Sequence, residues 1–428
     1  MKYLILVPDG SADWPNEDAG EKTPMEAAHM PHINGLAERG EVGMVKTIPD
    51  GIAPGSDAAN LAVMGYDPRT DLTGRSPLEA VSMGVELADT DVAFRVNLVT
   101  LKGGADADYD DLHIVDHSAG DITSDEAKTL IEYIDEKLGS GNPENGGRVT
   151  FYPGFSYRHA LVISEGARIA SGIGDVSGEA AGYALTPPHD VLEQRIGEHM
   201  PKGKGSDFLY RFMKESYELL KDHPINTDRA RRGLNVANSL WIWGQGKRPA
   251  LESFRSKFGI DGSVISAVDL IKGIGICAGL DSVHVEGATG TLDTNFSGKA
   301  NKAIEAFESG KDFVYVHVEA PDECSHQGDR AGKIRALELI DSEVLEPILS
   351  YLEGSGEDYR ILVVPDHRTP LSIRTHSDEP VPFVIFDSRS EKPNDASRVF
   401  SERSGEKGRQ FASGRELATW FFRYDIKI

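Results

Sequence analysis

Three aspartates and three histidines stand at the ends of short apolar runs in the sequence. They are Asp9, Asp322, His326, Asp366, His367 and His376. Carboxylate and imidazole groups together suit divalent zinc or manganese, and this set with one serine suffices for two sites. A single aspartate after a strand is more often a turn former or a helix cap. Capping does not require histidines after separate strands as well, so the combination predicts a metal centre.

Ser56 lies in the segment PGSDAANLAVMGYDP, between a Pro-Gly turn and an expected helix start. Serine is a preferred N-cap residue because its hydroxyl accepts a hydrogen bond from a free N–H of the first turn. The same position favours negative charge, so a phosphoryl group there would be stabilised. Whether Ser56 only caps the helix or also reacts depends on the side chains around it.

The apolar runs are typical of strands that are buried on both faces, because they are continuous and rich in β-forming residues. These runs are residues 3–7, 313–318, 360–365 and 383–386. Helical spacing appears in residues 298–310 and 331–354. The alternation predicts an α/β sandwich. In such parallel sheets ligands bind beyond the carboxyl ends of the strands, so we expect the aspartates and histidines to converge there.

The middle of the chain differs from its two ends in the kinds of sequence segment that it contains. From about Phe94 it carries the apolar stretch VNLVTL, the acidic glycine-rich stretch KGGADADYDDL and loops around residues 140–147. We interpret residues 93–239 as an inserted second domain. Residues 1–92 and 240–428 then form the two parts of one core.

Composition excludes several classes of function. The chain has 428 residues, of which 39% are hydrophobic, which is enough for two domains with proper cores. A formal net charge of −24 argues against a nucleic acid or an anionic membrane as partner. Cys277 and Cys324 alone predict neither a disulfide framework nor a thiolate metal site. No apolar stretch suits a signal peptide or a membrane span, so we expect a cytoplasmic protein.

The motifs taken together resemble those of a known family. The segments around Asp9 and Ser56, with HVEAPDECSHQGD, PDHRTP and THSDEPVP, resemble the alkaline phosphatase superfamily and specifically the archaeal-type cofactor-independent phosphoglycerate mutases. Further segments such as TGRSPLEA, DHSAGDIT, LTPPHD and HPINTDRARRGLNVAN extend the resemblance nearly from end to end. It implies a three-layer sandwich like that of alkaline phosphatase, with a mostly parallel central sheet and a smaller inserted α+β cap domain.

The resemblance also implies the metal ligands and the nucleophile. One ion would be held by Asp322, His326 and His376. The second would be held by Asp9, Asp366, His367 and the Ser56 oxygen. Mn²⁺ or Zn²⁺ suits these ligands best, Mg²⁺ and Co²⁺ are alternatives, and 2,3-bisphosphoglycerate is not needed. Ser56 takes the place of the family's phosphoserine, so we expect it to be both helix cap and nucleophile in the exchange of 2- and 3-phosphoglycerate.

The inserted domain is expected to exclude water and to bind the small phosphorylated substrate. Arginine forks match carboxylate and phosphate oxygens bidentately. The candidate substrate-binding residues of the insert are Arg95, Arg158, His189, Arg229 and Arg232, and the candidates for proton transfer are His117 as acid and Asp190 as base. Further candidates near the nucleophile or the core motifs are Asp57, Arg75 and Lys299.

Three other functions are compatible with the same motifs. Some members of the family are proposed to act as homoserine kinases in threonine biosynthesis. The sequence has no G-x-x-x-x-G-K-[ST] phosphate loop, so a kinase would use the same metals and serine on a nucleotide's terminal phosphate. A metal-dependent phosphatase or sulfatase and a metal-binding protein without turnover are the remaining alternatives.

Overall fold

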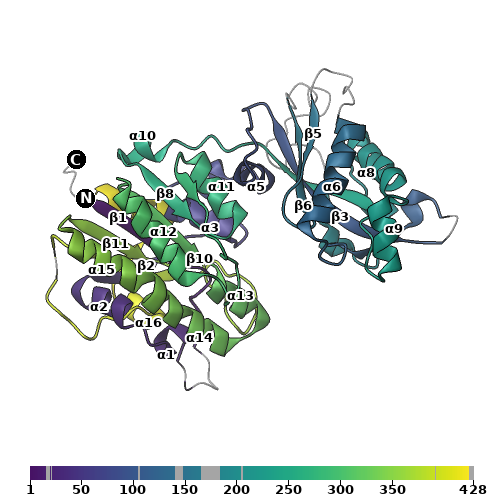
Figure 1. The fold of residues 1–428 in the computed structure, drawn as a ribbon. Helices are drawn as coiled ribbons and strands as arrows, with labels where there is room; N and C mark the ends of the chain where they lie inside the picture. Colours follow the sequence, from purple (N-terminus) through teal and green to yellow (C-terminus); the bar gives the residue numbers. More distant parts are fainter. Residues whose placement is uncertain are drawn as a thin grey trace. The chain divides into compact units, whose positions relative to one another are not determined.

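The chain folds into two compact units, each of which is described by itself (Figure 1). The computed structural model describes residues 1–15, 20, 22–104, 107–139, 148–164, 184–203, 206–390 and 392–423. The first unit combines Met1–Leu72 with Leu251–Ile428, and the second is Thr73–Ala250. The loops expected around residues 140–147 lie outside the described residues.

An eight-stranded sheet forms the centre of the first unit, in the order β13-β2-β12-β11-β1-β10-β8-β9. Its strands are β1 (Lys2–Pro8), β2 (Glu41–Val45), β8 (Gly262–Ile265), β9 (Asp281–Val283), β10 (Phe313–Val318), β11 (Tyr359–Val363), β12 (Val381–Asp387) and β13 (Arg409–Phe411). Only β12 runs antiparallel to its two neighbours, and the other pairs are parallel. The expected α/β class with a mostly parallel sheet is confirmed.

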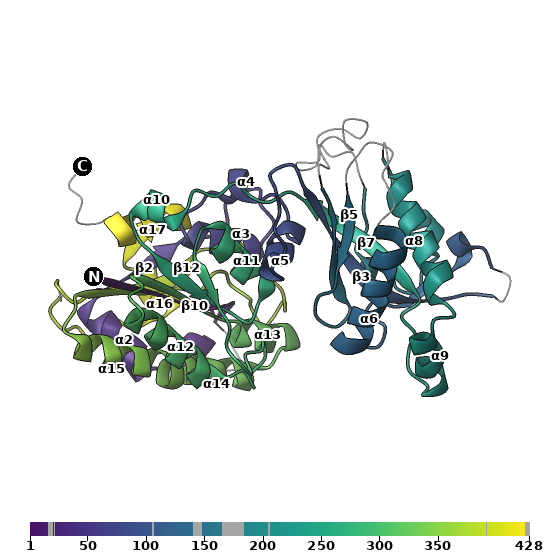
Figure 2. The ribbon, with the colours of Figure 1, turned by 45° about the horizontal axis from the view of Figure 1, so that its top comes forward.

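Helices cover both faces of this sheet (Figures 1 and 2). They are α1 (Pro24–Ala27), α2 (Pro31–Arg39), α3 (Ser56–Val63), α4 (Pro68–Asp71), α10 (Phe254–Phe258), α11 (Asp269–Cys277), α12 (Phe296–Glu308), α13 (Ala320–Gln327), α14 (Arg330–Leu339), α15 (Glu346–Ser355), α16 (Glu402–Gly405) and α17 (Gly414–Arg423). In β1, Lys2 Nζ reaches the carbonyl of Phe307 in α12, whereas the Tyr3 ring packs on Phe421 of α17. Because successive strand residues point to opposite faces, β1 is buried on both sides, which explains its continuous apolar run.

The long helical segment predicted at 331–354 is interrupted in the structure. It consists of α14, a short π-helical segment at Ile340–Leu345, and α15. Pro347 lies in the first turn of α15. Proline has no N–H, and its ring clashes with the carbonyl four residues earlier, which accounts for the widened turn before it.

The second unit is built on a five-stranded antiparallel sheet. Its strands are β3 (Val92–Lys102), β4 (His113–Asp116), β5 (Val149–Tyr152), β6 (Arg158–Ile163) and β7 (Ser239–Gly246), and its helices are α5 (Ser76–Ser82), α6 (Ser124–Ile134), α8 (Asp207–Leu220) and α9 (Pro224–Arg231). One apolar core, which includes Phe94, Leu161, Leu209 and Trp241, joins the sheet to α6 and α8. This unit therefore has its own core and the α+β composition expected of it.

The second unit extends beyond the expected range 93–239 at both ends. At the carboxyl end, β7 pairs with β3 through residues up to Gly246, so the chain stays in this sheet past residue 239. At the amino end, α5 packs against β3 and β7. That the unit serves as a substrate-binding cap stays a prediction.

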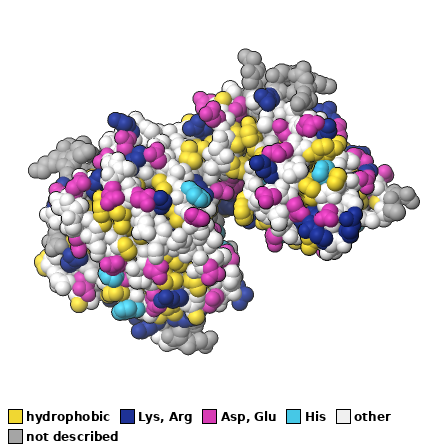
Figure 3. Space-filling view, in the orientation of Figure 1, with side chains coloured by type: hydrophobic (Ala, Val, Ile, Leu, Met, Phe, Trp, Pro, Cys, Tyr) yellow, Lys and Arg dark blue, Asp and Glu magenta, His cyan; other side chains and the backbone are white. Residues whose placement is uncertain are grey.

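The surface shows no single patch of basic residues on the face seen in Figure 3, where Lys and Arg side chains are mixed with Asp and Glu. In the described parts of the chain, none of the helices combines the length and apolar character that crossing a membrane requires.

Two helical glycines of the first unit predict opposite effects of the same substitution. A Cβ on Gly275 in α11 would lie 2.4 Å from Val264 Cγ1 in β8, whereas a Cβ on Gly354 in α15 would meet nothing within 4 Å. We expect Gly275→Ala to lower the free energy of unfolding by about 1–3 kcal/mol because the helix must move off the sheet. Gly354→Ala should raise it by up to about 1 kcal/mol, since alanine is the better helix former. Urea unfolding followed by circular dichroism measures both, and equal midpoints would refute the close packing of α11 on β8.

Candidate active site

The predicted metal ligands gather at one edge of the eight-stranded sheet. Asp9 follows β1, α13 with Asp322 follows β10, and Asp366 follows β11. These strands are parallel, so their carboxyl ends meet at the same edge. His376 precedes β12, and because β12 is antiparallel to β11, its start lies at that edge as well. Because β12 is reversed, His376 can precede its strand and still lie beside the aspartates that follow β1, β10 and β11.

The first group of ligands consists of Asp322, His326 and His376. His326 Nε2 lies 3.1 Å from Asp322 Oδ2 and 3.1 Å from His376 Nε2, and the other carboxylate oxygen is 3.6 Å from His376 Nε2. Asp322 and His326 are four residues apart on α13, which places them on one helix face. Nδ1 of His326 is 2.9 Å from the carbonyl oxygen of Arg374. A carbonyl oxygen only accepts hydrogen bonds, so Nδ1 must carry the hydrogen. In its neutral form His326 therefore presents a lone pair at Nε2, as a metal ligand must.

The second group contains Asp9, Asp366, His367 and Ser56. His367 Nε2 lies 3.5 Å from a carboxylate oxygen of Asp9, 3.5 Å from one of Asp366 and 3.1 Å from Ser56 Oγ. Asp9 Oδ1 is buried and has no hydrogen-bond partner among the described residues. The His367 and His376 rings are 4.0 Å apart between centroids, so the two groups adjoin. A buried oxygen without a donor and converging histidines fit the binding of divalent cations.

Burial, repulsion and hydrogen bonds shift the pKa values of Asp9 and Asp322 in opposite directions. Burial, followed by repulsion from Asp366 and Asp322, raises the pKa of Asp9 well above its ordinary value. Burial also opposes ionisation of Asp322, but hydrogen bonds with the histidines outweigh it and lower the pKa of Asp322. The same contact raises the pKa of His326 to about 9. Cations at this edge would therefore relieve repulsion that the protein alone leaves in place.

Ser56 is the first residue of α3, and the N-cap of that helix is Gly55. The expectation that Ser56 caps the helix is therefore wrong. The hydroxyl instead lies 3.1 Å from His367 Nε2, and the N-cap of the helix has no side-chain hydrogen bond. Ser56 thus stands at the positive end of the helix with its oxygen directed to the second ligand group.

Two side chains beside the ligands were not predicted. His317, inside β10, is buried, and its Nε2 lies 3.0 Å from Asp9 Oδ2 although it makes no hydrogen bond there. Burial lowers the pKa of His317 to about 4, so the ring is neutral. Thr369 Oγ1 donates to Asp322 and lies 3.2 Å from His367 Nδ1, so it bridges the two groups. The signal for His317 was a histidine within an otherwise apolar strand, VYVHV.

Grouping by ligand atoms gives a set that differs from the implied one. One nitrogen or oxygen each of Asp322, His367 and His376 lies within 4.8 Å of the others, and the same holds for a second trio. That trio is Asp9, His317 and Asp366. His367 therefore stands between the two groups.

The other candidates in the first unit are Lys299 and Asp57. Lys299 in α12 is fully buried, and its Nζ donates to the carbonyl of His317 at 3.3 Å. Burial lowers the pKa of Lys299 to about 8. Asp57 follows Ser56 in α3 and accepts from the N–H of Ala58. Arg75 belongs to the second unit, at the start of α5.

Several candidate substrate-binding residues of the second unit surround two aromatic rings. The Arg95 guanidinium lies 4.7 Å from the centroid of Trp243, and that of Arg158 lies 4.9 Å from the centroid of Tyr157. The rings of His117 and His189 are 6.4 Å apart, and each packs against one of these aromatic rings. His189 Nε2 is 3.8 Å from a carboxylate oxygen of the exposed Asp190. We call these five residues, with Tyr157 and Trp243, the aromatic-basic cluster.

Arg229 and Arg232 lie apart from this cluster in their contacts. Both form ion pairs with Glu126 in α6. Arg229 is buried and also donates to the carbonyls of Asn235 and Ala119. Its guanidinium therefore holds α9 to the neighbouring loops, whatever else it binds.

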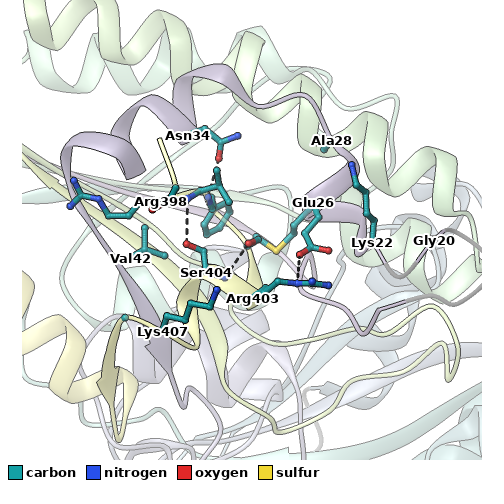
Figure 4. A pocket seen from close by; sticks show the side chains of 16 residues that line it. Gly20, Lys22, Glu26, Ala28, Asn34, Val42, Arg398, Arg403, Ser404 and Lys407 are labelled. Carbon is teal, nitrogen blue, oxygen red and sulfur yellow. Dashed lines mark hydrogen bonds and ion pairs between the residues drawn. The ribbon is translucent and has the colours of Figure 1, made fainter. Parts of the chain in front are cut away.

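A surface pocket of about 630 Å³ occurs elsewhere in the first unit, near α1 and α16 (Figure 4). Arg403 pairs there with Glu26 at 3.1 Å, and Arg398 donates to the backbone carbonyl of Gly40. None of the candidate metal ligands lines it. Converging ligand atoms indicate an active site more specifically than the volume of a pocket does. We therefore place the candidate site at the edge of the sheet.

Comparisons with known proteins agree on one family. Residues 37–226 match the family described as 2,3-bisphosphoglycerate-independent phosphoglycerate mutase. The curated protein of that name from Methanosarcina mazei is 46% identical over 409 residues, which cover 95% of this chain and 96% of the relative. One of two such mutases of Methanothermobacter thermautotrophicus is 45% identical over 389 residues, covering 90% of this chain and 88% of the relative.

Solved structures of similar fold extend over the whole chain. The PH0037 protein from Pyrococcus horikoshii has a TM-score of 0.77 at 27% identity and covers 100% of this chain and 98% of its own. The cofactor-independent phosphoglycerate mutase from Thermoplasma acidophilum has a TM-score of 0.66 at 25% identity, with coverage of 99% and 100%.

Gly10, directly after Asp9, is a position where any side chain should disturb the candidate metal ligands. Its φ is +59°, and a Cβ there would lie 2.3 Å from Asp322 Oδ1 and 2.5 Å from Thr369 Oγ1. We expect Gly10→Ala to displace the Asp322 carboxylate and to weaken Mn²⁺ binding about 10- to 100-fold. Gly51→Ala is the control, because Gly51 has a φ of +83° but open space around it. Calorimetric titration of the metal-free variants measures both affinities, and equal affinities would contradict the placement of Asp322 as a ligand.

Proposed function

The chain belongs to the 2,3-bisphosphoglycerate-independent phosphoglycerate mutases, which are isomerases, and we propose that it interconverts 2- and 3-phosphoglycerate through a phosphoserine at Ser56. The observation that carries this proposal is the position of the Ser56 hydroxyl, 3.1 Å from His367 at the junction of two Asp/His groups. A hydroxyl that only served the helix would not need this neighbour.

Two divalent cations complete the proposed site. Asp322, His326 and His376 would hold one ion, and Asp9, Asp366, His367 and Ser56 would hold the other. Bound ions would favour the serine alkoxide and offset the negative charge of a phosphoryl group. Manganese or zinc suits these ligands best.

Ser56 is the group that forms and breaks covalent bonds in the proposed reaction. Its oxygen attacks the phosphorus of 3-phosphoglycerate, the bond from phosphorus to the O3 oxygen breaks, and glycerate forms beside phosphoserine. The O2 hydroxyl of glycerate then attacks the phosphoserine, which restores the Ser56 oxygen and gives 2-phosphoglycerate. The phosphoryl group starts and ends on the substrate, so no 2,3-bisphosphoglycerate is required.

The residues of the second unit have two proposed tasks. Arg95, Arg158 and His189 of the aromatic-basic cluster would bind the carboxylate and phosphate, with Arg229 and Arg232 as further ligands. Lys299 of the first unit is a further candidate for binding the substrate. His117 would give a proton to the departing glycerate oxygen, and Asp190 would accept one from the attacking hydroxyl. Support for the first task is the stacking of the two guanidinium groups on Trp243 and Tyr157, and Arg95 also donates to the Glu79 carboxylate through two nitrogens.

We expect mutase activity that requires a divalent metal ion and no other added cofactor. Purified protein with Mn²⁺ and 3-phosphoglycerate should produce 2-phosphoglycerate, detected by coupling to enolase, without any bisphosphoglycerate. Removal of metal by chelation should abolish the activity, since the buried aspartates and histidines then lack their ions. Activity that is undiminished after exhaustive chelation would refute the metal requirement.

A parallel reaction separates the mutase from the alternatives. With ATP and homoserine in place of phosphoglycerate, we expect no ADP beyond that of a control without enzyme. Release of inorganic phosphate from 3-phosphoglycerate should be a small fraction of 2-phosphoglycerate formation. Homoserine-dependent ADP formation without mutase activity would assign a kinase, and dominant phosphate release would assign a phosphatase.

A further inference from the structure

Asn60 connects the nucleophile's helix to a metal ligand that is 306 residues away in the sequence. It lies one turn after Ser56 in α3 and is fully buried. Its Nδ2 donates to the carbonyl of Ser56 at 2.8 Å and to Asp366 Oδ2 at 2.8 Å. Both partners are acceptors, so the orientation of the amide is fixed, and each of its two hydrogens has its own acceptor.

Tyr315 holds the other end of the Asn60 amide. The Tyr315 hydroxyl donates to Asn60 Oδ1 at 2.5 Å, and both side chains are fully buried. Tyr315 belongs to β10, two residues before His317 on the same face of the strand. The amide therefore joins three separate parts of the first unit: helix α3, strand β10 and the loop after β11.

The Asp366 carboxylate is held from several directions at once. Its Oδ1 accepts from the backbone N–H of Gly10 at 3.1 Å and from that of His367 at 2.9 Å, while Oδ2 accepts from Asn60. The backbone contacts restrain one oxygen, and Asn60 restrains the other. Without Asn60 the carboxylate would be free to rotate about its bond to Cβ, and one buried oxygen would lose its donor.

We propose that Asn60 is a positioning residue that holds Asp366 and Ser56 in a fixed mutual arrangement, with Tyr315 fixing the amide. This inference rests on the proposed function, because it assigns Asn60 to the same site. A neutral amide suits this place because it donates two hydrogen bonds and adds no charge beside buried carboxylates. Asn60 touches neither substrate nor metal in this role and acts only through the two residues that it holds.

Asn60→Leu tests the role, since leucine has a similar volume and no hydrogen-bonding groups. We expect one of the two Mn²⁺ affinities of the metal-free protein, that of the site with Asp366, to fall about 10-fold or more. In the enolase-coupled assay kcat should fall by a similar factor while KM for 3-phosphoglycerate changes less than threefold, because the substrate's own ligands remain. Tyr315→Phe leaves the amide in place without its anchor, so we expect a smaller decrease of two- to fivefold in both quantities.

Asn226→Leu is the matched control for a loss of stability alone. Asn226 is a buried asparagine of the second unit whose Nδ2 donates to the carbonyls of Leu220 and Ala237 and whose Oδ1 accepts from the N–H of Ala237. It has as many hydrogen bonds as Asn60 but contacts no metal ligand candidate. We expect Asn226→Leu to lower the melting temperature and to leave the Mn²⁺ affinities unchanged.

Three results would separate the possible failures. Mn²⁺ affinities and kcat that stay unchanged in Asn60→Leu would overturn the positioning role. If Asn60→Leu does not fold, Tyr315→Phe provides the test. Wild-type Mn²⁺ affinities and a wild-type kcat in Tyr315→Phe would also overturn the positioning role. Wild-type protein that binds Mn²⁺ but shows no mutase activity would contradict the proposed function instead, and the Mn²⁺ titration of the variants would still report on Asn60.

Discussion

Three buried carboxyl groups at one sheet edge constrain the whole first unit. Asp9, Asp322 and Asp366 are each at most 6% exposed. Burying like charges together is unfavourable unless donors and cations compensate them. His326 and Thr369 supply donors to Asp322, and backbone N–H groups and the Asn60 amide supply donors to Asp366. Asp9 Oδ1 is buried without a hydrogen-bond partner among the described residues, so this compensation is incomplete, which is the physical reason for assigning cations to the site.

The sheet provides the arrangement that the carboxyl groups require. Parallel β1, β10 and β11 deliver an aspartate each at the same edge, and the reversed β12 adds His376. Helix α3 brings Ser56 to the same place, with its positive end toward the ligands. Ser56, Asp322 and His326 lie on helices, whereas the other groups lie in loops next to buried strands, so the packing of the core fixes where these loops begin or end.

The sequence was sufficient to predict the fold class and the elements of the site that follow apolar runs. Asp366 and His367 could be found because a buried strand marks where the chain reaches the sheet edge. Asn60 and Thr369 could not, because their roles depend on partners 306 and 47 residues away in the sequence. For His317 the signal was its place within an apolar strand, but its partner Asp9 follows a different strand. The capping role expected of Ser56 was wrong. The helix begins at Ser56 itself, so the N-cap position falls on Gly55. Local preference suggests such a cap, but tertiary contacts decide where the hydroxyl points.

We propose that the phosphoryl group passes through Ser56, and trapping the phosphoserine intermediate tests this step. The enzyme is acid-quenched during turnover with 3-phosphoglycerate carrying labelled phosphate, and its peptides are then mapped. The account predicts acid-stable labelled phosphoserine on the peptide containing PGSDAANLAVMGY. It also predicts no label and no turnover in Ser56→Ala, although that variant keeps both metal ions because six protein ligands remain. Label on any other residue, or an active Ser56→Ala variant, would contradict the account.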